Sequence, residues 1–281
     1  MKKFIGKLIT RTIGLYFNLA SFIVPKKIAE RAFLLFCTPR KGKVTKNQRG
    51  FLEDAKDLIL EHENTKIQTY RWKGSGTTIL LMHGWESNTF RWRNLIPRLQ
   101  EKNYNIIAMD APGHGNTSGN LLNLPLYSSC AQKVIDTYNP LYVIGHSLGG
   151  MALLYNLDKY KADNKSIEKV VTLGSPSELT DFMRQYKSIL GLSNRMMRII
   201  EDYFTKNFKA KFADFSSPRF AKNIDQKGLL IHDELDKIAP YWSSEQVHAR
   251  WKNSKLITTR GLGHSLHQDK VRDEIMAFLK S

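Results

Sequence analysis

The stretch Val143-Ile-Gly-His-Ser-Leu-Gly-Gly150 decides the fold, because its serine stands between glycines two positions before it and two positions after it. An apolar run precedes Ser147 and a helical pattern over 147–160 follows it, which predicts a tight strand-to-helix turn. The backbone at the tip of such a turn is strained, and Gly145 and Gly149 leave room where side chains would clash. The pattern predicts Ser147 as a nucleophile held above the edge of a sheet; an ordinary strand-to-helix turn is the alternative.

Around this turn, from about residue 66 onward, short apolar runs alternate with helical patterns. The runs with the residues that follow them are KIQTYRW, TTILLMHGW, NIIAMDAPGHG, LYVIGHSLGG, KVVTLGSP, GLLIHDELD and KLITTRGLGH, and the expected helices span 88–102, 125–138, 147–160, 240–252 and 267–280. Continuous apolar runs separated by helices indicate a mainly parallel sheet covered on both faces. We therefore expect a doubly wound α/β fold with its chemistry beyond the carboxyl ends of the strands.

Composition limits the alternatives. The chain has 281 residues, of which 42% are apolar, enough for one large α/β core or two small ones. The net charge of +17 comes mainly from residues 1–50, with twelve Lys/Arg against one acidic residue, and residues 181–222, with nine against four. These regions contain no recognised nucleic-acid module, so we expect no nucleic-acid partner. Cys37 and Cys130 are too far apart in sequence to indicate a disulfide framework or a zinc site.

The N-terminal segment 1–25 has the pattern of an amphipathic helix that ends near Pro25. Its basic and small polar positions recur at helical spacing: Lys3, Lys7, Arg11, Gly14, Asn18 and Ser21. The remaining positions form a wide apolar face: Ile5, Leu8, Ile9, Ile13, Tyr16, Leu19, Ala20 and Ile23. The longest uncharged run, 12–25, has 14 residues, fewer than the roughly 20 of a membrane span, and no small-x-small cleavage signal follows.

Three hypotheses for this helix stay open. It docks on the rest of the protein, it lies in the interface of an anionic membrane, or it is a secretion signal. We expect a cytoplasmic protein, peripheral to the membrane if the second hypothesis holds.

Several motifs fall in one order along the chain. They are His83-Gly84-Trp85, Asp110-Ala-Pro-Gly-His-Gly115, Gly145-His-Ser-Leu-Gly149, Asp236 with Pro240, and Gly263-His264. On these motifs the chain resembles the α/β-hydrolase superfamily over about residues 64–281. The serine members of that superfamily are esterases, lipases, thioesterases and some peptidases and acyltransferases, and the resemblance implies that no metal or organic cofactor is needed. It also implies the chain order nucleophile, acid, base.

The base is expected after the last strand. A serine hydroxyl is a poor nucleophile until a base takes its proton, so an imidazole is required. The resemblance implies His264, at the end of Arg260-Gly-Leu-Gly-His264. His267 is the rival, with helix capping or solvent exposure as its alternative.

The acid is expected among the carboxylates that end the run GLLIH. Asp236 is followed by Lys-Ile-Ala-Pro, where Pro240 suits the first turn of a helix, and this matches the position of the family's acid. Asp233 and Glu178 remain alternatives. Glu234 is expected to face solvent.

Two backbone N–H groups are expected to form the oxyanion hole. That of Leu148 opens the helix after the nucleophile, and the resemblance implies that of Trp85 as the second donor. The Trp85 indole either lines an acyl pocket or packs in the core. His83, His114 and His146 are expected to form turns and struts without a chemical role.

The expected domains are a basic helical extension (1–60), a hydrolase core (61–176 and 224–281) and a helical cap insertion (177–223). The insertion is rich in Met and aromatic residues, which either pack it on the core or line a site for an acyl or aromatic substrate. The residues together predict a serine hydrolase that cleaves esters or thioesters of a small, acyl or lipid-like substrate through an acyl-enzyme. An acyltransferase with the same triad and a catalytically silent binding protein are the alternatives.

Overall fold

The structure, a computed structural model, describes residues 2–281. The side chains of residues 2–5 and 7 lie outside the described residues, and with them the Lys3, Ile5 and Lys7 positions of the predicted amphipathic helix. The chain forms two compact units. The larger unit consists of Pro39–Ser177 with Ser217–Ser281, and the smaller unit consists of the residues up to Thr38 with Glu178–Ser216.

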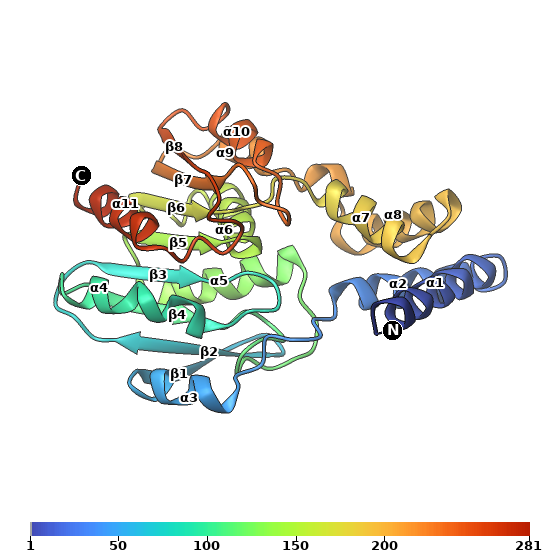
Figure 1. Ribbon diagram of the computed structural model, residues 1–281, viewed down its shortest axis with the longest axis horizontal. Coiled ribbons are helices and arrows are strands. Elements are labelled where there is room, and N and C mark those ends of the chain that lie inside the picture. The colour runs from blue at the N-terminus through green and yellow to red at the C-terminus, as the bar shows by residue number, and fades with distance from the viewer. Residues whose placement is uncertain (1) are drawn as a thin grey trace. The chain divides into compact units, whose positions relative to one another are not determined.

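The larger unit is built on an eight-stranded sheet with the order β1-β2-β4-β3-β5-β6-β7-β8 (Figure 1). The strands are β1 (Lys56–His62), β2 (Thr65–Trp72), β3 (Thr78–Met82), β4 (Asn105–Met109), β5 (Tyr142–His146), β6 (Lys169–Leu173), β7 (Lys227–Asp233) and β8 (Ser254–Thr259). β1 pairs with β2, and β2 with β4, in antiparallel fashion, and all other neighbours are parallel. The mainly parallel α/β sheet predicted from the sequence is confirmed.

Helices cover both faces of this sheet. On one face a single apolar cluster joins alternate strand residues, such as Ile79 and Leu81, to α3 (Lys46–Glu53), η1 (Thr89–Asn94), α4 (Ile96–Gln100) and α11 (Asp269–Lys280). A second group of helices is not part of that cluster: α5 (Leu124–Tyr138), α6 (Leu148–Lys159), α9 (Ser217–Ala221) and α10 (Trp242–His248). Within this group α5 contacts α6, α6 contacts α9, and α9 contacts α10. Every residue of β4 and β6 is buried, as expected for strands inside a parallel sheet.

The boundaries of the units differ from the expected 1–60 and 177–223. α3 and β1 belong to the larger unit, because Leu52 packs in the core cluster and β1 pairs along its whole length with β2. β1 is an edge strand with Leu58 and Ile59 both exposed, so its sequence lacks the pattern of a half-buried strand. At the other boundary α9 contacts α6 within the larger unit, and the insertion therefore ends at Ser216.

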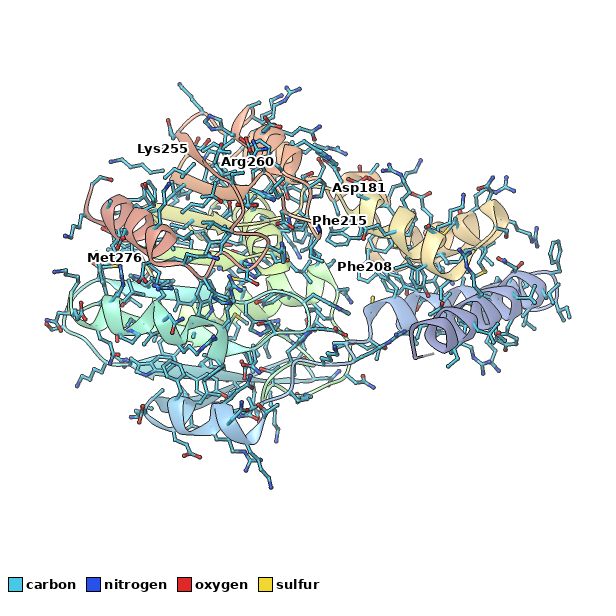
Figure 2. All side chains as sticks on the ribbon, viewed as in Figure 1. Asp181, Phe208, Phe215, Lys255, Arg260 and Met276 are labelled. Atoms are coloured by element: carbon cyan, nitrogen blue, oxygen red, sulfur yellow. The ribbon has the colours of Figure 1, made fainter. Side chains whose placement is uncertain are left out.

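The smaller unit joins the N-terminal extension to the insertion. It contains α1 (Lys2–Ala20), α2 (Pro25–Cys37), α7 (Leu179–Leu190), α8 (Asn194–Phe208) and η2 (Phe212–Asp214). The Phe33 ring of α2 lies 5.7 Å from that of Phe204 on α8. Phe204 in turn contacts Phe208 and Phe215, which Figure 2 labels, at 4.7 and 5.3 Å between ring centroids. The insertion's aromatic residues thus form the core of this unit.

α1 ends earlier than predicted. Its last residue is Ala20, and Pro25 instead begins α2, where its fixed φ suits the first helical turn. Among the described residues, none of the helices combines the length and the apolarity that crossing a bilayer requires.

Candidate active site

The turn between β5 and α6 has the strained geometry that its sequence predicts. Ser147 has φ 52° and ψ −125°, a backbone conformation that is costly for a residue with a side chain. A Cβ at Gly145 would lie 2.6 Å from the Cα of Gly150, and a Cβ at Gly149 would lie 2.5 Å from the carbonyl oxygen of His83. Both positions therefore require glycine, and their small size lets the serine stand at the end of the strand.

Three side chains from three separate loops meet at this turn. The Nε2 of His264 lies 3.0 Å from the Oγ of Ser147, and its Nδ1 lies 2.7 Å from the Oδ2 of Asp236. A carboxylate oxygen can only accept, so Nδ1 carries the proton and Nε2 is left as the acceptor for the serine hydroxyl. The structure brings together the three residues that the sequence singled out.

Asp236 is buried and held on both oxygens. Its Oδ1 accepts the backbone N–H groups of Ile238, at 2.8 Å, and Ala239, at 3.0 Å. Its Oδ2 faces the Nε2 of His232 at 3.4 Å in addition to His264. Burial alone would raise the pKa of Asp236, but the hydrogen bonds from His232, His264 and Ile238 outweigh it and hold the pKa well below its ordinary value. The acid is ionised throughout the neutral range.

His232 is a contact that sequence reasoning missed. Its Nδ1 lies 2.6 Å from the Oγ of Ser244 and its Nε2 lies 3.0 Å from the carbonyl oxygen of Ala239, so Nε2 carries the proton. In the sequence, His232 is visible only as a histidine at the end of an apolar run. Its spacing of four residues from Asp236 does not distinguish a contact with that carboxylate from simple core packing.

The other carboxylates that the sequence offered make contacts away from His264. Asp233 accepts from Thr259 Oγ1 and from the N–H of Leu262, both at 2.8 Å, and from the N–H groups of Leu235 and Gly261. These bonds outweigh the effect of burial and lower its pKa, and they fix the loop that leads to His264. The other two carboxylates are used elsewhere: Glu234 is exposed and lies 3.2 Å from Arg260, and Glu178 accepts from Ser216 Oγ at 2.8 Å.

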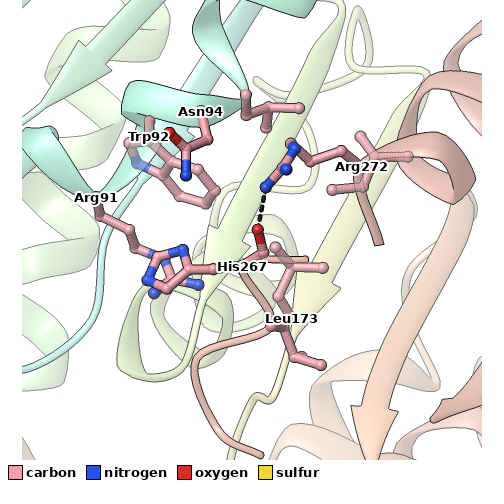
Figure 3. A pocket seen from close by; sticks show the side chains of 9 residues that line it. Arg91, Trp92, Asn94, Leu173, His267 and Arg272 are labelled. Atoms are coloured by element: carbon pink, nitrogen blue, oxygen red, sulfur yellow. Dashed lines mark hydrogen bonds between the residues drawn. The ribbon is translucent and has the colours of Figure 1, made fainter. Parts of the chain in front are cut away.

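His267, the rival base, lies in a separate cavity of about 20 Å³, shown in Figure 3. Arg91 and Arg272 line this cavity with it, and a guanidinium nitrogen of Arg272 donates to the His267 carbonyl oxygen. Burial, followed by the charges of Arg91, Arg93 and Arg272, lowers the pKa of His267 to about 4. A cavity of this size holds about one water molecule. His267 also lines a pocket of about 270 Å³, so volume does not decide between the two imidazoles, but it is His264 whose Nε2 lies 3.0 Å from Ser147 Oγ.

The loop after β3 lies directly against the serine. A Cβ at Gly84 would be 2.8 Å from the Cβ of Ser147, which brings the backbone that carries the Trp85 N–H beside the nucleophile. The Trp85 side chain is 37% exposed, so the hypothesis that it packs in the core is wrong. On the other side of Ser147, Leu148 is the first residue of α6, so its N–H lies at a helix N-terminus.

Two buried histidines fix that loop. His83 donates through Nδ1 to the Gly84 carbonyl oxygen at 2.7 Å and accepts through Nε2 from the Ala111 N–H at 2.9 Å. His114 accepts through Nε2 from the Glu86 N–H at 3.0 Å. Both are struts, as the sequence suggested.

His146 has a role beyond the turn that the sequence predicted. Its ring centroid lies 4.9 Å from that of His264, and its Nε2 lies 2.9 Å from the His264 carbonyl oxygen. A carbonyl only accepts, so Nε2 carries the proton and donates. Burial, then the nearby Arg91 and His264, lowers the pKa of His146 well below its ordinary value. His146 therefore positions the backbone of His264 as a neutral residue.

In the part of the chain that the structure describes, no group of three or more His, Cys, Asp or Glu residues could hold a metal ion. The site is instead a serine at a strained turn, an imidazole and a buried carboxylate at the carboxyl ends of parallel strands. Fold and site together define the α/β-hydrolase class.

Comparisons with known proteins agree with this class. A family model described as the alpha/beta hydrolase fold matches residues 77–199, and one described as TAP-like protein matches residues 211–281. The uncharacterized hydrolase YugF of Bacillus subtilis is 24% identical over 280 residues, covering 83% of this chain and 97% of the relative.

A named esterase is also similar. The pimeloyl-[acyl-carrier protein] methyl ester esterase of Neisseria meningitidis serogroup C is 33% identical over 223 residues, covering 66% of this chain and 86% of the relative; the serogroup A protein is 23% identical. Among solved structures, the esterase Pf2001 of Pyrococcus furiosus has a TM-score of 0.65 at 20% identity, covering 86% of this chain and 96% of its own. The chain belongs to the α/β hydrolase fold family, and these matches assign it to the hydrolases of that fold.

Proposed function

We propose that this protein is a serine hydrolase that cleaves carboxylic ester or thioester bonds through an acyl-enzyme. The observation that carries the proposal is the line of hydrogen bonds from Ser147 through His264 to Asp236, with distances of 3.0 and 2.7 Å. Each group has the protonation state that acyl transfer needs: an ionised carboxylate, an Nδ1–H imidazole and a serine hydroxyl facing the free Nε2.

The reaction follows from these positions. His264 Nε2 takes the proton of Ser147 as Oγ attacks the substrate carbonyl, and the negative charge of Asp236 stabilises the imidazolium. The negatively charged oxygen of the tetrahedral intermediate accepts hydrogen bonds from the backbone N–H groups of Trp85 and Leu148. His264 then returns the proton to the leaving alcohol or thiol. A water molecule then attacks the acyl-enzyme by the same steps, with His264 as its base, and the carboxylic acid product is released.

The class of bond is supported by the relatives. The Neisseria protein is named for a methyl ester, and the Pyrococcus structure is titled an esterase. An acyltransferase would use the same residues and admit an alcohol or amine in place of water. The products formed from an activated acyl ester with and without an added alcohol separate the two reactions.

The test of the nucleophile uses a fluorophosphonate probe and p-nitrophenyl esters of increasing chain length. The probe should label Ser147, and Ser147→Ala should lose about 10⁴- to 10⁶-fold in turnover, the range known for deletions within a serine triad. Ser166→Ala is the matched control and should keep wild-type turnover, because the Ser166 hydroxyl bonds the Asn139 side chain at 2.8 Å in the connection between α6 and β6. Labelling that persists in Ser147→Ala would overturn the proposal.

A further inference from the structure

The buried side of α1 is the polar side that the sequence predicts. Asn18 donates to the Gly191 carbonyl oxygen at 2.9 Å and accepts from the Ser193 N–H at 2.8 Å, both at the junction of α7 and α8. Gly14 lies so close to α7 that a Cβ there would be 1.8 Å from the carbonyl oxygen of Leu190. Ser21 is fully buried. Phe17 is also buried on α1, at 5% exposed, so the helix docks on the insertion through one aromatic side chain together with small and polar residues.

The opposite side of α1 is consequently left exposed, and it is apolar. Together with the turn after α1 it forms what we term the α1 apolar face: Leu8, Ile9, Leu15, Leu19, Phe22 and Ile23, each 54% to 82% exposed. Arg11 and Thr12 are exposed between Leu8 and Leu15 as well, but a gathering of so many exposed large aliphatic and aromatic side chains on one helix is unusual on a monomeric protein and marks an interaction site. The orientation is the reverse of an ordinary surface helix, whose apolar side faces the core.

Positive charges lie beside the part of this face that is nearest to the turn after α1. Lys26 and Lys27 are exposed at the start of α2, next in sequence to the turn, and Arg31 donates to the Tyr16 hydroxyl at 3.3 Å. The Arg195 guanidinium lies 4.7 Å from the Phe22 ring centroid. Residues 1–38 contain seven Lys/Arg against the single acidic Glu30. An apolar surface with a basic rim is complementary to a layer of acyl chains beneath negatively charged headgroups.

We propose that the α1 apolar face binds the surface of anionic lipid bilayers. α1 lies in the plane of the interface, with its leucines below the headgroups and Lys26 and Lys27 among the phosphates. A second copy of the chain is the less favourable occupant, because a symmetric contact through this face would bring two basic rims together. The inference concerns where the protein works and does not depend on the reaction at Ser147.

Co-sedimentation with vesicles tests the proposal on the full-length chain. Protein should bind vesicles of equal parts phosphatidylcholine and phosphatidylglycerol, bind phosphatidylcholine alone much more weakly, and be released from the anionic vesicles by salt. Leu15→Gln/Leu19→Gln/Ile23→Gln should weaken binding by about 100-fold or more, since three aliphatic side chains no longer leave water. Lys26→Gln/Lys27→Gln should weaken binding to anionic vesicles by about tenfold or more.

The matched control is Leu58→Gln/Ile59→Gln, which removes two similarly exposed aliphatic side chains from β1 in the larger unit and should leave vesicle binding unchanged. All variants change exposed residues, and thermal unfolding checks that they stay folded. The triple variant should keep wild-type turnover of a water-soluble ester, which separates this inference from the proposed reaction. Wild-type protein that ignores anionic vesicles would overturn the proposal. So would a triple variant that binds as well as wild type, or a wild-type dimer that the triple variant dissociates without any vesicle binding.

Discussion

Asp236→Asn should abolish most of the activity while changing one atom, and the backbone around Asp236 explains why. Oδ1 of Asp236 accepts two N–H groups, from Ile238 and Ala239. The amide oxygen of asparagine must take this place, because an NH₂ group there would face two donors. The amide nitrogen is therefore forced to the Oδ2 position, 2.7 Å from Nδ1 of His264.

An NH₂ group at that position requires an acceptor at Nδ1, so His264 changes to the tautomer with its proton on Nε2. That proton points at Ser147 Oγ, and the imidazole can no longer act as the base. We expect kcat/KM to fall by about 10⁴-fold, the size of the tautomer effect in serine proteases. This corresponds to about 5.4 kcal/mol of transition-state stabilisation.

Hydrolysis of p-nitrophenyl acetate, followed together with the rate of fluorophosphonate labelling, measures the effect. Asp233→Asn is the control, because it carries the same chemical change three residues away. Asp233 bonds the loop backbone and not His264, so its variant should lose about 1–3 kcal/mol of stability and keep most of its turnover. Equal losses of turnover in the two folded variants would refute the reasoning from amide orientation.

Further outcomes follow from other buried groups. Burial lowers the pKa of His83 to about 3, whereas the unfolded chain protonates near 6.5, so His83 alone should contribute a fall in stability in urea of about 1.4 kcal/mol per pH unit as the pH drops from about 6.5 toward 4, in addition to the contributions of His146 and His267. His83→Gln should remove this part of the slope. Gly149→Ala should destabilise the fold by about 1–3 kcal/mol in urea unfolding, since the clash with backbone carbonyl oxygens exceeds the gain in helix propensity of about 1 kcal/mol. Burial raises the pKa values of Cys37 and Cys130 to about 12, so neither thiol should react with a disulfide reagent at pH 8 until the protein unfolds.

The sequence predicted the parallel part of the sheet well because its signals are local. β5 and β6 are runs of apolar residues buried on both faces, and each gives a continuous pattern. β1 was missed since its exposed Leu58 and Ile59 are stabilised by pairing with β2, a contact that local patterns do not contain. The single helix expected over 88–102 is divided into η1 and α4, and Pro97 falls in the first turn of α4, where a proline is tolerated.

The three central residues of the site were predictable for a different reason. Ser147 is marked by glycines that the strained turn requires, and Asp236 and His264 follow in the family's chain order. The residues that position these three have no motif in the sequence that identifies them. His232 and His146 act through contacts separated by 4 and 118 positions, and a histidine at a strand end has the same appearance whether it supports a site or only fills a core.

Hydrogen-bond partners distinguish the structural histidines of this chain from the one that is proposed to react. His83 and His114 each face a backbone carbonyl oxygen with one nitrogen and a backbone N–H with the other, which fixes one neutral tautomer. Such a ring is satisfied only without charge, so protonating it breaks a hydrogen bond inside the fold. His264 differs, because its two nitrogens face the Asp236 carboxylate and the Ser147 hydroxyl. His232 also lies near Asp236 and a serine hydroxyl, but its Nε2 donates to the Ala239 carbonyl oxygen and its hydroxyl partner is Ser244. In the proposed reaction, the proton that His264 takes from Ser147 leaves both of its hydrogen-bond partners in place. The proposed proton transfer therefore uses the imidazole that lies beside Ser147.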